Sequence, residues 1–157
     1  MPKSALGQHP LDLRNAHKTD TRAQVAALCW RKKKGKVQIC LITSRGSKRW
    51  IIPKGWPIHN HTPSASAAVE AFEEAGLQGF VSDQVLGIYG HRAPDRLENA
   101  PILTMVFPMQ VDKVRSDWPE RKQRRRKWFS IEKASKKVDD PALRAIIQTF
   151  KANRGKR

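Results

Sequence analysis

Three glutamates lie within five positions of a chain that is otherwise strongly basic. Glu70, Glu73 and Glu74 belong to the stretch VEAFEEAG at residues 69–76, whereas the whole chain carries 31 Lys and Arg against 14 Asp and Glu, a net charge of +17. On a helix, positions i, i+3 and i+4 share one side, so the three carboxylates converge there. Converging hard oxygen ligands suit Mg²⁺ or Mn²⁺. The spacing predicts a divalent-metal site, with a solvated acidic helix face as the alternative.

This arrangement of glutamates is unfavourable without a counter-charge. Like charges at these spacings cost roughly 0.2–0.5 kcal/mol per pair. Acidic groups in the last turn of a helix also face the negative end of its dipole. No Lys or Arg occurs between Lys54 and Gly90 to relieve the repulsion. A bound dication would neutralise the cluster, so we favour the metal site over the solvated face.

A helix must hold these glutamates, and the sequence marks both of its ends. Thr62 can cap it, Pro63 can take its first position, and Gly76 suits the residue just beyond its C-terminus. We therefore predict a helix over residues 63–75. An apolar stripe at helical spacing is the predicted core face, and it puts the glutamates on the opposite side. Its members are Ala68, Ala71, Phe72 and Ala75.

The remaining elements predict one layered α/β domain with a mixed sheet. Apolar runs predict strands at 24–30, 37–43, 50–52, 85–89 and 102–111, the last interrupted by Pro108. Further helices are expected at 131–138, capped by Ser130, and at 141–151. The predicted organisation is a flexible N-terminal arm at 1–20, a domain at 21–151 and a basic C-terminal tail at 152–157.

The basic composition predicts an acidic partner, which can be nucleic acid, an anionic membrane or a phosphorylated small molecule. No apolar run reaches the roughly 18 residues that span a bilayer. The first twenty residues lack the apolar region of a secretory signal. Cys29 and Cys40 lie in apolar runs and are predicted to be buried, reduced thiols. The expected location is cytoplasmic.

The residues before the glutamates complete a longer motif. From Gly55 the chain reads GWPIHNHTPSASAAVEAFEEAGL. This stretch resembles the box of the Nudix hydrolases, G-x5-E-x7-R-E-U-x-E-E-x-G-U, in which U is a bulky aliphatic residue. The matching positions are Gly55, Glu70, Glu73, Glu74, Gly76 and Leu77. His61 replaces the first glutamate of the box, Val69 replaces its arginine, and Ala71 is a small substitute for U.

Two further stretches, TSRGSKRWIIPKGWP and DWPERKQRRRKWFSIEKA, are similar to the diphosphoinositol polyphosphate phosphohydrolase branch of that family. The resemblance implies an α/β/α sandwich with a mixed β-sheet. It also implies hydrolysis of phosphoanhydride bonds in inositol pyrophosphates or dinucleoside polyphosphates, with Mg²⁺ or Mn²⁺ bound by Glu70, Glu73 and Glu74. One of these glutamates would help to orient or deprotonate the attacking water.

The polyphosphate is expected to lie near a basic segment that precedes the box. The residues predicted to bind it are Ser44, Arg45, Lys48, Arg49 and Lys54. A further metal ligand often comes from outside the box, and Glu98 is the nearest candidate in sequence. His59 and His61 could add imidazole ligands, although histidines in such a loop are more often exposed.

The departures from the box leave two other functions open. His61 and Val69 remove one carboxylate and the cation expected to hold the glutamates in place. The first rival is a catalytically weakened domain that binds nucleic acid or polyphosphate through its basic surface. The second is an enzyme acting on RNA 5′ ends. The basic run 121–127 is interpreted as a solvated or polyphosphate-facing loop, because it lacks interleaved aromatic residues.

Overall fold

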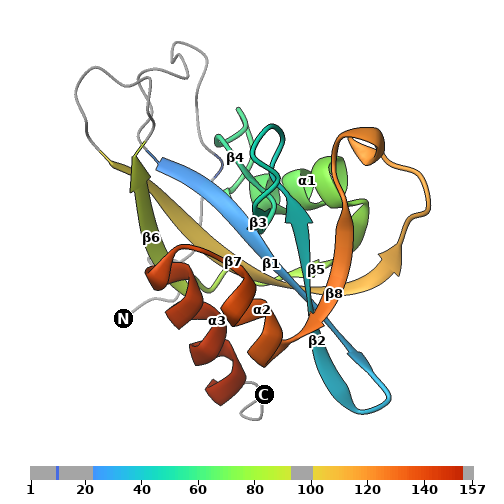
Figure 1. Cartoon of the computed structure of the whole chain (residues 1–157). Helices are drawn as coiled ribbons and strands as arrows, with labels where there is room; N and C mark the ends of the chain where they lie inside the picture. Colours follow the sequence, from blue (N-terminus) through green and yellow to red (C-terminus); the bar gives the residue numbers. More distant parts are fainter. Residues whose placement is uncertain (1–9, 11–22, 93–100, 154–157) are drawn as a thin grey trace, which may run out of the picture.

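A computed structural model describes Pro10, residues 23–92 and residues 101–153 (Figure 1). The predicted arm at 1–20, apart from Pro10, and the last four residues of the predicted tail lie outside these ranges. In chain order the elements are β1 (Ala23–Lys33), β2 (Lys36–Thr43), β3 (Trp50–Ile51), β4 (Lys54–Gly55), α1 (Pro63–Ala75), β5 (Leu77–Val81), β6 (Gly87–Arg92), β7 (Pro101–Val114), the 3₁₀ helix η3 (Arg121–Gln123), β8 (Arg126–Ser130), α2 (Ile131–Lys137) and α3 (Pro141–Asn153).

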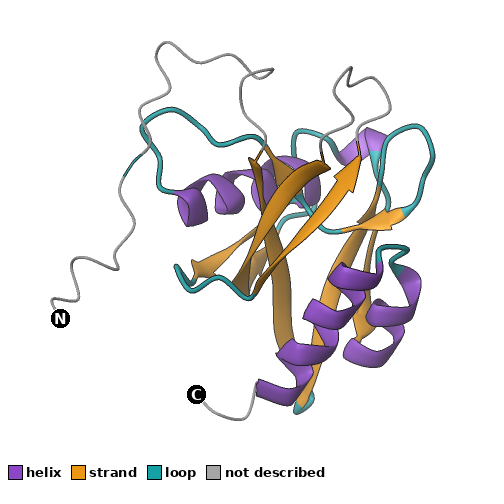
Figure 2. Cartoon of the chain, turned by 90° about the vertical axis from the view of Figure 1, so that its left-hand side faces the viewer, coloured by secondary structure: helices purple, strands orange, loops and turns teal. Residues whose placement is uncertain are grey.

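The strands form one mixed sheet in the order β3-β2-β1-β7-β5. β1 and β7 run parallel, whereas the other pairs are antiparallel, including β8 with β2, β4 with β1 and β6 with β7. Helix α1 covers one face of the sheet, and α2 and α3 cover the other (Figures 1 and 2). The predicted α/β/α sandwich with a mixed sheet is confirmed.

Each face of the sheet has its own apolar core. Along β1, side chains alternate between the two sides. Ala26 and Leu28 join the cluster beneath α2 and α3, and Val25 and Ala27 join the cluster beneath α1. This two-sided burial explains why β1 reads as a continuous apolar run. Cys29 and Cys40 are buried free thiols, as predicted. No helix among the described residues is long and apolar enough to cross a membrane.

Strand β7 is continuous through Pro108, so the predicted interruption is wrong. The carbonyl of Pro108 accepts a hydrogen bond from the backbone N–H of Ser82. The missing N–H of Pro108 points to the same side of the strand, because N–H and C=O of one strand residue share a side. On that side β7 pairs with β6 up to Val106, and its pairing with β5 begins at Met109. Pro108 therefore sits where one neighbouring strand has ended and the next begins, and no ladder bond is lost.

Helix α1 begins and ends where the sequence predicts. The backbone N–H of Ala65 donates to the Thr62 hydroxyl at 3.1 Å, and Gly76 closes the helix with φ of 67°, in the left-handed region that favours glycine. The predicted core face is partly wrong: the face against the sheet is centred on Ala67, Ala71, Glu74 and Ala75, whereas Phe72 is half-buried. Glu74 is consequently only 7% exposed instead of solvated.

Candidate functional site

The loop that follows β4 brings the first residue of the box against its first helical glutamate. A Cβ atom added to Gly55 would lie 2.7 Å from each carboxylate oxygen of Glu70. Real Cβ atoms essentially never approach so closely, so a side chain at this position would force the Glu70 carboxyl to move. The fifteen-residue separation of Gly55 and Glu70 thus corresponds to a direct packing contact.

The side chains of Glu70 and Glu74 hydrogen-bond to each other. Burial, followed by the Glu74 charge, raises the pKa of Glu70 to about 8; Glu73 and Glu120 act in the same direction. Burial also raises the pKa of Glu74, although the Arg124 guanidinium and the backbone N–H of Lys54 oppose this. Because these two groups stabilise an ionised Glu74, the shared proton belongs on Glu70.

Glu74 is held by an arginine that is distant in sequence. Nη2 of Arg124 lies 3.5 Å from Oε2 of Glu74, and Nε of the same guanidinium donates to Oε1 of Glu120 at 2.8 Å. Its Nη1 donates to the carbonyl oxygen of Thr43 at 3.1 Å. The Arg124 side chain is 6% exposed and that of Glu74 is 9% exposed, so this ion pair is shielded from water. Buried pairs of this kind require further hydrogen bonds, and Arg124 makes two, to Glu120 and to the Thr43 carbonyl.

The segment from residue 115 to 126 binds the C-terminal carbonyls of α1. These carbonyls lack partners within the helix, and α1 has no basic residue in its last turn. Two backbone N–H groups donate to these carbonyls: that of Glu120 to the carbonyl of Glu73 at 3.1 Å, and that of Arg115 to the carbonyl of Gly76 at 2.8 Å. Two side chains do the same: Nε1 of Trp118 donates to the carbonyl of Glu74 at 3.1 Å, and Nη1 of Arg126 donates to the carbonyl of Ala75 at 2.8 Å. The guanidinium of Arg126 also stacks over the Trp118 ring at 4.0 Å. Within the run 121–127 five residues are exposed, as predicted, whereas Arg124 and Arg126 are half-buried against the end of the glutamate helix.

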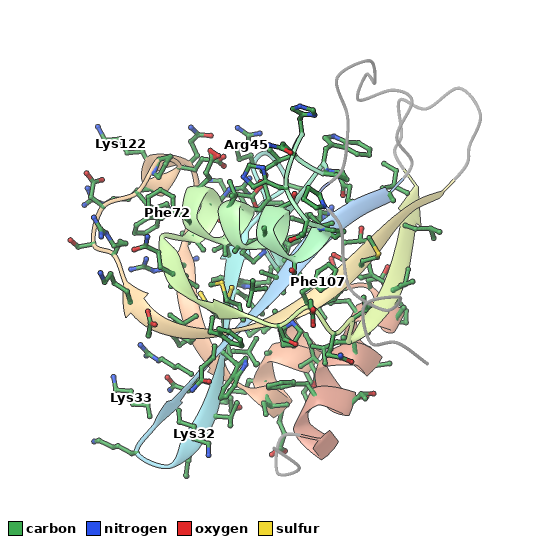
Figure 3. All side chains as sticks on the ribbon, turned by 180° about the vertical axis from the view of Figure 1, so that it is seen from behind. Lys32, Lys33, Arg45, Phe72, Phe107 and Lys122 are labelled. Carbon is green, nitrogen blue, oxygen red and sulfur yellow. The ribbon has the colours of Figure 1, made fainter. Side chains whose placement is uncertain are left out.

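Four of the five predicted phosphate-binding residues lie in the β2–β3 loop, next to this segment, and the fifth, Lys54, begins β4. Nη1 of Arg45 donates to Oε1 of Gln123 at 2.9 Å, which joins the loop to η3. Figure 3 shows Arg45 and Lys122 at the end of the molecule where α1 lies, with Lys32 and Lys33 at the opposite end. Ser44 accepts from the backbone N–H of Arg49 at 2.9 Å and closes the turn, while Arg45, Lys48 and Arg49 are exposed.

Lys54 lies between this loop and the glutamates. Its backbone N–H donates to Oε1 of Glu74 at 3.3 Å. Burial, followed by the nearby charge of Arg49, lowers the pKa of Lys54, and the carboxylate of Glu74 partly offsets this. The structure thus brings Lys54 and Arg49 into one electrostatic environment with the box glutamates.

The donor set fits a hard divalent ion held by few protein ligands. Across residues 23–92 and 101–153, no three His, Cys, Asp or Glu side chains are already arranged around one metal position. Mg²⁺ usually takes only one or two carboxylates and fills its remaining positions with phosphate oxygens and water. The touching carboxyls of Glu70 and Glu74 match that requirement. Ring Nδ1 of His61 lies 3.0 Å from the carbonyl oxygen of His59, so this ring is engaged within its own loop.

Glu120, Arg124 and Trp118 are site residues that the sequence predictions missed. Glu98, the predicted extra ligand, lies outside the described residues, and the carboxylate brought to the box glutamates from elsewhere in the described chain is Glu120. One signal was present in the sequence: Glu120 is the only acidic residue between Asp117 and Glu132, in front of an otherwise basic run.

The geometry can now be set beside known proteins. A family model described as NUDIX domain matches residues 20–150. The chain belongs to the Nudix hydrolase family. Members of this family are pyrophosphohydrolases that typically use divalent metals and act on small phosphorylated substrates.

Curated relatives and solved structures agree with the Nudix assignment. Diphosphoinositol polyphosphate phosphohydrolase 3-alpha of Mus musculus is 32% identical over 117 residues, covering 73% of this chain and 68% of that protein. The mitochondrial Nudix hydrolase 12 of Arabidopsis thaliana is 29% identical over 103 residues. The match covers 63% of this chain but only about half (51%) of the length of that protein. An Ap4A hydrolase of C. elegans superimposes with a TM-score of 0.66 at 18% identity, covering 84% of this chain and 97% of that one, which shows a shared fold.

Proposed function

We propose that this Nudix protein is a divalent-metal-dependent pyrophosphohydrolase acting on diphosphoinositol polyphosphates or dinucleoside polyphosphates. The observation that carries the proposal is the contact between the half-buried carboxyl of Glu70 and the buried carboxyl of Glu74, beside an exposed basic loop. The substrate class is supported by the relative that is 32% identical, a diphosphoinositol polyphosphate phosphohydrolase, and by the fold shared with an Ap4A hydrolase.

Glu70 and Glu74 would hold Mg²⁺ or Mn²⁺, with Glu73 and Glu120 adding negative charge nearby. When bound, the ion would neutralise charge on the phosphate oxygens and lower the pKa of an attacking water. The proton on Glu70 must leave before both carboxylates can act as ligands, because the two share one hydrogen bond. Glu73 then remains as a carboxylate that can orient the water or accept its proton.

The exposed basic residues of the β2–β3 loop would bind the phosphates distant from the bond that is cleaved. Arg45 and Arg49 offer guanidinium forks that match phosphate oxygens, and Lys48 offers a point charge. The hydrogen bond from Arg45 to Gln123 sets the loop against η3 without burying it. A substrate with several phosphates would thus reach from the glutamates to this loop.

The test is hydrolysis of a phosphoanhydride panel by the purified chain with Mg²⁺ or Mn²⁺. The panel contains an inositol pyrophosphate, a dinucleoside tetraphosphate, a nucleoside diphosphate sugar and RNA with a 5′ triphosphate. We expect turnover of one of the first two, with loss of activity in EDTA. Turnover of only the RNA, or of no compound with either metal, would contradict the proposal.

A second candidate, binding of nucleic acid through the basic surface, is favoured by one observation. A groove of about 730 Å³ is lined by residues of β2, β8 and α2. Lys127, Lys133, Lys136 and Lys137 line it, and its lining contains no acidic residue. Such a groove could follow a phosphate backbone. Under this alternative, His61 and Val69 would have weakened the box while the basic surface retained a binding function.

A further inference from the structure

We propose that Arg124 is the residue that positions Glu74 and Glu120 for metal binding, so that the missing box cation at Val69 is supplied from the β7–β8 connection. The inference rests on the proposed metal-dependent function. Helix α1 contains no Lys or Arg, and Val69 lies one turn before Glu73 on its surface. The glutamates therefore have no cationic partner within their own helix.

The contacts of Arg124 fix its guanidinium in three directions. Its Nη2, Nε and Nη1 atoms face Glu74, Glu120 and the carbonyl oxygen of Thr43, at 3.5, 2.8 and 3.1 Å. With a side chain only 6% exposed, the guanidinium has little freedom to rotate into solvent. A planar fork held on three sides can hold two carboxylates at a constant separation, which a single ammonium group cannot do.

The backbone around Arg124 is anchored on both sides of the site. On the side of α1, Glu120 N donates to Glu73 O and Trp118 Nε1 donates to Glu74 O. On the side of β2, Thr43 N donates to Arg125 O at 3.0 Å and Arg125 N donates to the Thr43 hydroxyl at 2.9 Å. The arginine thus bridges the glutamate helix and the sheet, and it is in place before any metal arrives.

Arg124 acts through the glutamates and not on the substrate. Its three donor atoms are engaged by protein oxygens, and the side chain is almost entirely covered. The exposed arginines of the β2–β3 loop, by contrast, are available for phosphate. If Arg124 positions the glutamates, its substitution should change metal affinity and kcat. If it bound the substrate instead, its substitution should change KM.

The experiment measures Mn²⁺ binding to the substrate-free protein by titration calorimetry, and then kcat and KM on the best substrate of the panel. Arg124→Gln removes the cation, and Arg124→Lys keeps the charge but loses the fork. The matched control is Arg125→Gln, which removes an equal charge from the adjacent, exposed arginine. Thermal unfolding of each variant separates loss of the fold from loss of the site, and Arg124→Lys keeps the test available should Arg124→Gln fail to fold.

We expect Arg124→Gln to weaken Mn²⁺ binding by about 10-fold or more, the usual effect of removing a partner of a metal ligand. It should lower kcat with little change in KM, Arg124→Lys should recover less than half of the loss, and Arg125→Gln should resemble the wild type. Unchanged Mn²⁺ affinity in folded Arg124→Gln and Arg124→Lys, or a raised KM at unchanged kcat, would overturn the inference. Because metal binding is measured without substrate, Arg124-dependent Mn²⁺ binding in a protein that hydrolyses nothing would uphold the inference and refute the proposed function.

Discussion

Gly55 and Glu70 are in direct contact, although fifteen positions separate them in the chain. The α-carbon of the glycine lies beside the glutamate carboxyl, in a space that a Cβ atom would fill. The loop after β4 and the middle of α1 therefore determine each other's positions. This contact gives the first glycine of the box a steric reason, and the reason can be tested without knowing the substrate.

Gly55→Ala should displace the Glu70 carboxyl and destabilise the protein by about 1 kcal/mol, the low end for over-packed sites, because the clashing group ends a flexible side chain. The free energy of unfolding in urea measures the loss. In a Glu70→Ala background the same substitution should cost at least about 0.5 kcal/mol less, because the clashing group is gone. An equal loss in both backgrounds would show that the effect of the alanine does not involve Glu70.

Glu73→Gln and Glu74→Gln should each lower turnover at least about 100-fold, because each removes charge needed at the metal site. Their effects on stability should differ. Glu74→Gln leaves the buried Arg124 without one of its two carboxylates and should cost about 1 kcal/mol or more. Glu73 is half-buried and has no ion pair among those the structure shows, so its change should stay within about 0.5 kcal/mol. Steady-state kinetics and thermal unfolding measure the two properties, and full activity in both variants would refute the site.

The pH dependence of the metal-free protein should follow Glu70. Its pKa is raised from 4.5 to about 8 by burial and by Glu74. Between these two values the unfolded chain has lost the proton that the folded protein keeps, so the free energy of unfolding in EDTA should fall as the pH rises from about 4.5 to about 8. The raised pKa of Glu74 acts with the same sign. Glu70→Gln should flatten this dependence, and an equally steep curve in that variant would contradict the assignment of the proton.

Metal affinity supplies the complementary pH measurement. Mn²⁺ must displace the Glu70 proton, so binding should strengthen as the pH rises toward about 8 and should release a proton into the buffer. Calorimetry in two buffers of different ionisation enthalpy counts that proton. Binding without proton release at about pH 7 would mean that Glu70 is already ionised.

Val69→Arg tests whether the box of this chain is incomplete. Because Arg124 already holds Glu74 and Glu120, a second guanidinium beside Glu73 should change Mn²⁺ affinity and turnover by less than about 3-fold. A rise of about 10-fold or more in either quantity would mean that the glutamates are poorly held in the natural protein. That result would favour the catalytically weakened binder, above all if the natural chain hydrolyses nothing on the panel.

The choice between compact polyphosphate and nucleic acid depends on where the useful positive charge lies. Substituting the whole run 121–127 would be uninformative, since Arg124 and Arg126 are bonded to the glutamate helix region. The informative pair is Arg45→Ala, at the end where α1 lies, and the triple change of Lys133, Lys136 and Lys137 to alanine, in the groove. We expect Arg45→Ala to raise KM for an inositol pyrophosphate at least about 10-fold, by loss of a charged phosphate contact, with the triple variant close to wild type.

The same two variants are then titrated with a short single-stranded RNA between about 50 and about 200 mM salt. Weak binding that neither variant changes is expected. Tight RNA binding that survives Arg45→Ala, collapses in the triple variant and falls steeply with salt would place the function in the groove. That result would displace the small-molecule substrate.

Local signals made the glutamate helix predictable. Thr62, Pro63 and Gly76 determine its ends through contacts within one or two turns, and the i, i+4 spacing lets the carboxyls of Glu70 and Glu74 meet. The long strands β1 and β2 were also predictable, because burial on both faces makes their central residues a largely apolar run. Strand β5 was missed: only its first residue is buried, and a register shift between Gln78 and Gly79 removes any alternation.

The remainder of the site depends on tertiary structure that no local pattern encodes. Proximity in sequence pointed to Glu98, and Glu120 was not considered; Glu120 reaches the glutamates because its segment binds the end of α1. Likewise, counting charges near the box indicated an unrelieved cluster, although the relieving cation stands fifty positions beyond Glu74. The orientation of α1 was misjudged for a related reason: Phe72 dominated the predicted stripe, but the small side chains of Ala67, Ala71 and Ala75 face the sheet.

Strand β8 pairs with β2 alone among the described strands, so one of its edges offers free backbone N–H and C=O groups. An edge of this kind can recruit a strand from another copy of the chain, and lysines along it discourage such recruitment. The exposed Lys127 in β8, together with the lysines of the neighbouring helix α2, gives this edge a repulsive charge. Part of the positive charge would therefore act against pairing between copies of the molecule. A polyanion bound along β8 would remove that repulsion and could link copies of the protein edge to edge.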